Sequence, residues 1–367
     1  MTQGDLRGMV EVAVMRLWEE LLGACPAPEE DFFAAGGDSI ALLTLATELE
    51  DQFGVPFALV DFVACPTPAF LTGLVLRSKL ERSSLTSAPS SELLRPLSQA
   101  TRPFPPIFLV HSAAGEHTYL SPTLNDLPLY SYRALGVLPT ETPLASMGDM
   151  ARLYVEKLVI KSPDGPYFLA GYSAGATIAH AMAALLEKTP RGGPLALISI
   201  DGAGPTRPSY TARPQELLQT RLVSLVKKCV GDDAALRLQE GYTEHAALQH
   251  LTAVHESRLR RLPDAWGQTL DELYRLQSVY AHVASACAAY EWAPIVSKVV
   301  LLMATRSNPD EARLRACWSQ TTSGGCELIH LNETHETIRV SATAAQALRD
   351  VVAAACAERT ISGQLSG

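Results

Sequence analysis

Long apolar runs are absent from this sequence of 367 residues. No stretch approaches the 18 or so apolar residues that a membrane-spanning helix needs. The N-terminus also lacks a basic region followed by an apolar one, so a secretory signal is not expected. From these two absences we expect a cytoplasmic chain with no membrane partner.

Cysteine pairs with the spacing of a metal or disulfide site are also missing. The seven cysteines are scattered and include no C-x-x-C pair, which favours reduced thiols. Three histidines, His245, His250 and His255, are spaced by five residues, so they do not share one face of a helix. We therefore expect no metal site.

An excess of basic residues is the third absence. The formal net charge is −9, and residues 1–80 carry twelve acidic side chains against four basic ones. Such a balance argues against a nucleic-acid partner. It also indicates a separate N-terminal unit, whose acidic surface either docks on basic protein patches or only keeps the chain soluble.

What is present is enough apolar sequence for two domains. Hydrophobic residues make up 47% of the chain and charged residues 19%, so sizeable cores are expected. Helical spacing or apolar composition predicts four short helices within residues 1–80, over residues 5–23, over 39–53, in "FALVDFV" and in "TPAFLTGLVLRSKL". Four short helices in this length predict a small all-α bundle.

Residues 81–106 differ from the segments on either side. They hold six serines and five prolines in 26 positions. This composition predicts a linker, partly extended by its prolines.

Alternating strand and helix patterns fill residues 107–360. The strands are expected in "IFLVHS", "YFLAGYS", "LALISIDG", "KVVLLMAT" and "CELIHLN", with helices between and after them. Continuously apolar strands separated by helices predict a mostly parallel sheet covered on both faces, as in an α/β-hydrolase domain. Helical patterns alone occupy residues 205–290, too long for a connection, and predict a lid.

One short motif, Gly171-Tyr172-Ser173-Ala174-Gly175, carries nucleophile chemistry. It is G-x-S-x-G between a predicted strand and a predicted helix. Glycines allow the sharp turn that exposes a serine hydroxyl, and the helix N-terminus faces a developing oxyanion. Ser173 is therefore the candidate nucleophile.

A serine nucleophile needs a base and an orienting carboxylate. The chain order Ser…Asp…His points to Asp201, after the strand "LALISI", and to His335, after the last strand. Asp310, after "KVVLLMAT", is the rival acid, and Asp201 is preferred. Considered alone, Asp201 would be interpreted as a helix cap and His335 as a surface residue.

An oxyanion hole needs two convergent backbone N–H groups. Ala174, directly after the nucleophile, is expected to supply one, and Ala113 in "VHSAAGE" the other. His111 belongs to the same strand-to-loop signature and is not expected to be catalytic.

A second serine, Ser39, ends the run "DFFAAGGDS" just before a predicted helix. Asp38 or Ser39 could cap that helix. The aromatic pair and glycine pair before it resemble, however, the motif of peptidyl carrier domains in nonribosomal peptide synthetases. The resemblance implies that Ser39 carries a covalent 4′-phosphopantetheine arm, attached by a phosphopantetheinyl transferase.

The remainder is similar to the type I thioesterase domain that ends such synthetases. The matching stretches are "IFLVHSAAGE", "PYFLAGYSAGATIAHAMA", "LALISIDGAGP", "KVVLLMAT" and "THETI". Two departures are Ser112, where the family commonly has proline, and Glu333-Thr334, where it usually has glycine and a small or acidic residue. The likeness covers nearly the whole chain except the linker and the lid.

This resemblance implies a function for the whole chain. An acyl or peptidyl thioester would pass from the arm on Ser39 to Ser173 and be released by hydrolysis or cyclisation. Upstream adenylation and condensation modules would be partners, and Met1 could be an artificial start. Carbon–carbon coupling of acyl units, a non-catalytic scaffold and a proofreading hydrolase are the alternatives.

Overall fold

The computed structural model divides the chain into two compact units. One holds residues 1–90 with 226–234 and 248–273, and the other holds the remaining residues. The structure describes residues 3–32, 34–37, 41, 44–45, 48–49, 52–53, 67–76, 92–98, 104–113, 115, 124, 126–162, 164–205, 213–229, 232–252, 270–307, 310–339 and 341–365.

The N-terminal part of the first unit is helical, as predicted. Helix α1 spans Gln3–Leu22 and ends at Gly23, whose φ of 77° suits the residue after a helix. The described residues between 41 and 53 are helical, and a further helix covers residues 68–76. The predicted helix in "FALVDFV" lies outside the described residues. Twelve of the described apolar side chains are buried together in its core: Val10, Ala13, Val14, Leu17, Trp18, Phe32, Leu45, Leu49, Phe53, Leu71, Leu74 and Val75.

In the part of the second unit that the structure describes, seven strands form one sheet in the order β1-β3-β2-β4-β5-β6-β7. Strand β1 is antiparallel to β3, and the other neighbours are parallel. The strands span Leu94–Pro96, Ile107–Val110, Leu129–Tyr132, Phe168–Tyr172, Leu197–Ile200, Val299–Ala304 and Cys326–Leu331, numbered in chain order. All residues of β2, β4, β5 and β6 are buried, which explains their continuously apolar sequences.

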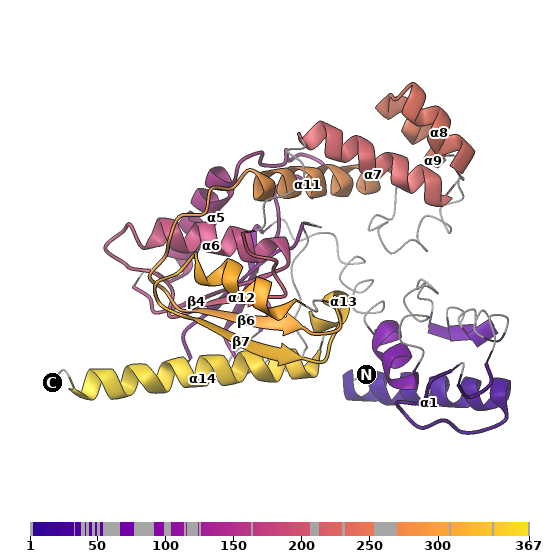
Figure 1. Cartoon of the computed structure of the whole chain (residues 1–367), viewed down its shortest axis with the longest axis horizontal. Coiled ribbons are helices and arrows are strands. Elements are labelled where there is room, and N and C mark those ends of the chain that lie inside the picture. Colours follow the sequence, from indigo (N-terminus) through magenta and orange to yellow (C-terminus); the bar gives the residue numbers. More distant parts are fainter. Residues whose placement is uncertain are drawn as a thin grey trace. The chain divides into compact units, whose positions relative to one another are not determined.

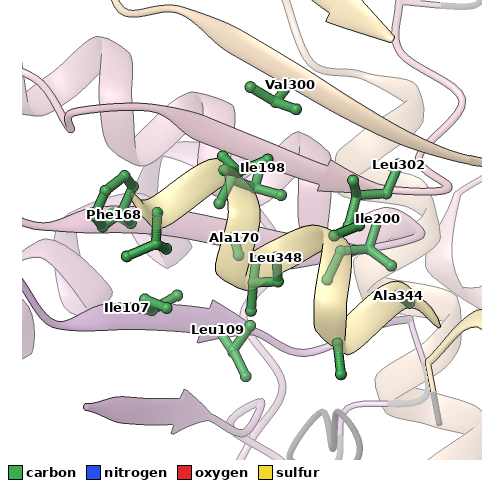
Figure 2. Packing of buried hydrophobic residues seen from close by; sticks show 14 of the residues in the cluster. Ile107, Leu109, Phe168, Ala170, Ile198, Ile200, Val300, Leu302, Ala344 and Leu348 are labelled. Atoms are coloured by element: carbon green, nitrogen blue, oxygen red, sulfur yellow. The ribbon is translucent and has the colours of Figure 1, made fainter. Parts of the chain in front are cut away.

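Helices cover both faces of this sheet (Figure 1). Helices α5 (Met147–Lys161) and α6 (Ala174–Leu186) pack together, and α6 contacts β2, β4 and β5. Helix α14 (Ala342–Leu365) lies on the other face, where Ala344 and Leu348 meet the strands (Figure 2). Two further short helices, α12 (Glu311–Ser319) and α13 (His335–Ile338), follow β6 and β7.

Two strands were not predicted. Leu94–Pro96 falls within the linker expected over residues 81–106, yet it pairs with β3 as the edge strand β1. Proline is tolerated there because an edge strand has one side without a neighbour. Strand β3 was missed because four residues with two tyrosines and a serine give little periodicity. Residues 94–96 of the segment predicted as a linker therefore belong to the sheet.

Most of the described residues in the insertion expected over residues 205–290 are helical. Helices α7 (Pro214–Cys229), α8 (Asp232–Glu240), α9 (Glu244–Thr252) and α11 (Leu270–Ala288) all follow β5 and precede β6. Among the described helices, none is both long and apolar enough to cross a bilayer.

Candidate active site

Ser173 stands at a strained turn between β4 and α6. Its φ of 54° and ψ of −121° are unusual for a residue other than glycine, and its N–H donates to the carbonyl of Ile200 at 3.0 Å. The flanking glycines are required by close packing. A Cβ at Gly171 would lie 2.2 Å from the backbone of Gly175, and one at Gly175 would lie 2.5 Å from the carbonyl oxygens of Val110 and His111. Such a turn exposes a serine side chain at the carboxyl edge of the sheet.

His335, the first residue of α13, lies beside Ser173. Its Nε2 is 3.1 Å from Ser173 Oγ, and its Nδ1 is 2.6 Å from Asp201 Oδ2. If Nδ1 carries the hydrogen and donates to the carboxylate, Nε2 is left to accept from the serine hydroxyl. The structure thus brings together the three side chains that the sequence selected.

Asp201 is positioned by its backbone as well as its side chain. It follows β5 with a φ of 50°, its N–H donates to Leu302, and its Oδ1 accepts from the N–H of Ala304 at 2.9 Å. The carboxylate is fully buried, and the bond from Ala304 to Oδ1 leaves Oδ2 directed at His335.

The rival acid Asp310 has another contact. Its Oδ1 accepts from the N–H of Arg313 at 2.9 Å and caps α12. In the described residues, the hydrogen bonds therefore favour Asp201 as the partner of His335.

Two residues that the sequence analysis did not single out, Tyr172 and Ser307, also hold His335 in place. The ring of Tyr172 stacks on the His335 ring at 5.0 Å, and its hydroxyl donates to the His335 carbonyl at 2.8 Å. Ser307 Oγ accepts from the His335 N–H at 2.7 Å. The aromatic residue inside G-x-S-x-G was the available signal for Tyr172. Ser307 offered none, because its contact joins residues 28 positions apart.

The segment after Asp201 is held by Trp318 of α12. The indole N–H donates to the carbonyl of Gly202 at 3.0 Å, and the ring lies so close to Gly204 that a Cβ there would be 2.8 Å from it. Trp318 is fully buried. It stabilises the backbone immediately next to the carboxylate.

The two expected oxyanion donors lie on neighbouring segments. Ala174 opens α6, and Ala113 follows β2, whose Val110 pairs with Gly171 of β4. Both residues thus lie at the carboxyl edge where Ser173 stands. Their convergence on one oxygen stays a prediction.

Helix α11 covers both segments. A Cβ on Gly115 would lie only 2.4 Å from a methyl carbon of Val279. The sulfur of Cys287 is 3.8 Å from the carbonyl oxygen of Ala174. Burial raises the pKa of the Cys287 thiol to about 12, so it stays protonated and uncharged. Helix α11 thus places an apolar side chain beside Gly115 and an uncharged thiol beside the elbow.

His111 is structural in its contacts. It is fully buried, with Nδ1 2.7 Å from the carbonyl of Ser112 and Nε2 2.6 Å from the hydroxyl of Tyr154. This agrees with its exclusion from the catalytic set. No group of three or more potential metal ligands occurs among the residues that the structure describes, and His255 lies outside them.

Two buried histidines should make the fold sensitive to acid. Burial lowers the pKa of His111 to about 4, and likewise that of His180 in α6, whose ring lies 4.6 Å from that of Trp292. Between pH 6.5 and 4 the unfolded chain takes up protons at these residues that the folded chain excludes. The free energy of unfolding should therefore be highest above pH 6.5 and fall by roughly 3 kcal/mol per histidine as the pH drops to 4.

Urea titrations at pH 7.5 and pH 4.5 measure this loss. His180→Gln should reduce the difference in unfolding free energy between the two pH values by about 2 kcal/mol. An unchanged difference in His180→Gln would contradict the assignment.

Ser39 and Asp38 lie outside the described residues, but the turn before them is described. Gly37 donates to the carbonyl of Phe32 at 2.9 Å and packs so closely on its ring that a Cβ would be 2.2 Å away. Phe32 is buried against Trp18, with ring centroids 4.8 Å apart. The aromatic residue and the second glycine of "DFFAAGGDS" thus form a tight turn that leads into Asp38-Ser39.

Comparison with protein families matches both halves of the chain. A model described as "Thioesterase domain" matches residues 105–351, and one described as "Phosphopantetheine attachment site" matches residues 12–75. The expected order of a carrier domain and a thioesterase domain is confirmed, as is phosphopantetheine as the carrier's cofactor. Which serine holds it stays a prediction.

Among curated proteins, similar sequences occur in long synthetases. Malpinin synthetase of Mortierella alpina is 32% identical over 200 residues, which are 53% of this chain and 2% of the synthetase. Chondramide synthase of Chondromyces crocatus is 27% identical over 277 residues, 72% of this chain and 6% of that one. The chain therefore spans only a small part of these relatives.

Among solved structures, a four-domain nonribosomal peptide synthetase with bound AMP and glycine has a similar fold. It is 18% identical, with a TM-score of 0.52, and the match covers 96% of this chain and 26% of that one.

Proposed function

Since the chain belongs to the thioesterase domain family, we propose that it is the terminal carrier–thioesterase unit of a nonribosomal peptide synthetase. Its reaction would be the release of an acyl or peptidyl chain held as a thioester. The observation that carries the proposal is the line of hydrogen bonds from Ser173 through His335 to Asp201.

In the first step, His335 Nε2 takes the proton of Ser173 while Oγ attacks the thioester carbonyl. The imidazolium that forms is stabilised by the buried carboxylate of Asp201. The N–H groups of Ala174 and Ala113 hold the oxyanion. When the tetrahedral intermediate collapses, the carbon–sulfur bond breaks, His335 returns the proton to the departing thiolate, and an ester on Ser173 remains.

In the second step, His335 removes a proton from the nucleophile that attacks the ester. Water releases an acid, and an amine or hydroxyl of the acyl chain itself releases a ring. The proton passes back to Ser173 Oγ as the ester bond breaks. The uncharged Cys287 thiol of α11, which lies beside the elbow, is compatible with an apolar acyl chain.

The carrier half would deliver the substrate. A 4′-phosphopantetheine arm, when bound, supplies a thiol that holds the acyl group as a thioester. We assign its attachment to Ser39, because this serine directly follows "DFFAAGGD" and lies within the residues that match a phosphopantetheine attachment site. A phosphopantetheinyl transferase and upstream adenylation and condensation modules would then be the partners.

One loading experiment tests both halves. The full chain is incubated with a phosphopantetheinyl transferase and an aminoacyl- or fatty-acyl-coenzyme A, and its intact mass is followed with time. The wild type should gain the mass of the acylated arm and then lose only the acyl part. Ser173→Ala should retain the acyl group, and Ser39→Ala should gain no mass.

The two proposals fail separately. A wild type that gains no arm contradicts the assignment of Ser39. An acylated wild type that loses its acyl group no faster than Ser173→Ala contradicts the role of Ser173.

A further inference from the structure

The side chain of Glu333, two residues before His335, gathers three hydroxyl groups. Oε2 accepts from Thr337 Oγ1 at 2.6 Å, and Oε1 accepts from Thr343 Oγ1 at 2.9 Å and from Ser341 Oγ. This is the position at which the sequence departs from the family pattern. A glycine there could make none of these bonds.

Each of two hydroxyls that donates to Glu333 also accepts from backbone. Thr337 Oγ1 accepts from the N–H of Thr334 at 2.9 Å, while Thr334 Oγ1 accepts from the N–H of Thr337, which closes the capping box of α13. Because a hydroxyl has one hydrogen, donating it to Glu333 leaves the oxygen free to accept from Thr334. The carboxylate thus orients the turn that begins with His335.

The second hydroxyl connects this turn to the core. Ser341 Oγ accepts from the N–H groups of Thr343 and Ala344, at 3.1 and 3.3 Å, and so caps α14. The first turns of α14 are firmly packed, since Ala344, Ala345 and Leu348 are fully buried against the sheet (Figure 2 labels Ala344 and Leu348). A carboxylate at this end of the helix is also favoured by the helix dipole.

We propose that Glu333 is a positioning residue that ties the His335 turn to the N-terminus of α14. The imidazole of His335 is about one-third exposed, at 36%, so packing alone does not hold it. Asp201, Tyr172 and Ser307 contact His335 itself. Glu333 acts on the backbone that carries it. This role rests on the proposed function of His335 as the base.

The test measures inactivation by a serine-directed fluorophosphonate, separated into its maximal rate constant, kinact, and its half-saturating concentration, KI. Each full-length variant is assayed well below its own denaturation temperature. Glu333→Ala and Thr337→Val should each lower kinact about 10- to 100-fold, with KI changed less than about 3-fold. Thr337→Ser, which keeps the hydroxyl, should restore a kinact close to that of the wild type.

The pair Glu333→Ala and Thr337→Val should not be additive, because both changes break one chain of hydrogen bonds. The double variant should react no more slowly than the slower single variant. Glu327→Gln is the matched control, because this exposed glutamate of β7 pairs only with Lys298 in the described contacts. Its kinact should equal that of the wild type.

The outcomes distinguish the proposed function from the positioning role of Glu333. A folded wild type that is not labelled at Ser173 contradicts the proposed function. A labelled wild type with an unchanged kinact in Thr337→Val and Glu333→Ala contradicts only the positioning role, even if their denaturation temperatures fall. Should Glu333→Ala not fold, Thr337→Val against Thr337→Ser decides the question.

Discussion

Replacement of Asp201 by asparagine is expected to lower the rate of acyl-enzyme formation at Ser173 about 10⁴-fold. The reason is the direction of one hydrogen bond. The asparagine oxygen can still accept from the N–H of Ala304, as Oδ1 does now. Its NH₂ group would then face His335 Nδ1 and donate to it. The histidine hydrogen would move to Nε2, where it blocks acceptance of the serine proton. Fluorophosphonate labelling and acyl release both measure the effect.

Asp310→Asn is the matched control for Asp201→Asn. Because asparagine caps helices about as well as aspartate, the cap on α12 should survive and the labelling rate should stay within about 3-fold of the wild type. A large loss of activity in Asp310→Asn, with little loss in Asp201→Asn, would reverse the assignment of the acid.

A methyl group on Gly175 is expected to prevent correct folding of the elbow. In Gly175→Ala the added Cβ would lie 2.5 Å from two carbonyl oxygens of the β2 segment, and backbone atoms cannot turn aside as a flexible side chain can. We expect a loss of several kcal/mol in the free energy of unfolding, little soluble protein and no labelling at Ser173. Calorimetry and labelling measure the result.

Gly148→Ala serves as the control for the added methyl group. Gly148 lies in the first turn of α5, and the nearest atom to a Cβ there is Ser146 Oγ at 4.0 Å. Alanine should be neutral or stabilising by up to about 1 kcal/mol. A folded and active Gly175→Ala protein would contradict the tight packing between α6 and β2.

The fold was predictable where a pattern is repeated and local. The strands β2, β4, β5, β6 and β7 were expected because each is continuously apolar or nearly so, and the helices between them follow from their spacing. Strands β1 and β3 were not, because each is stabilised by its partner rather than by its composition. Leu94–Pro96 contains a proline within a serine- and proline-rich stretch, and only its pairing with β3 makes it a strand.

The candidate site divides in the same way. The sequence by itself identified Ser173 as the candidate nucleophile, because G-x-S-x-G between a strand and a helix describes a local turn. It also predicted that Asp201 and His335 follow strands at the same edge of the sheet. It left Asp310 as a rival acid. Only the tertiary structure distinguishes the two, because the hydrogen bond from His335 to Asp201 joins residues 134 positions apart while Asp310 caps its own helix.

The role of Glu333 was beyond the sequence for a related reason. In the sequence, Glu333 was only a departure from a family pattern, and nothing indicated which contacts its side chain makes. Its three hydroxyl partners are near in the chain, but they converge on one carboxylate only because α13 ends close to the start of α14. Local patterns thus identified Ser173, Asp201 and His335 as candidates. The packing of helices on the sheet decided which of them meet, because that depends on contacts between distant parts of the chain.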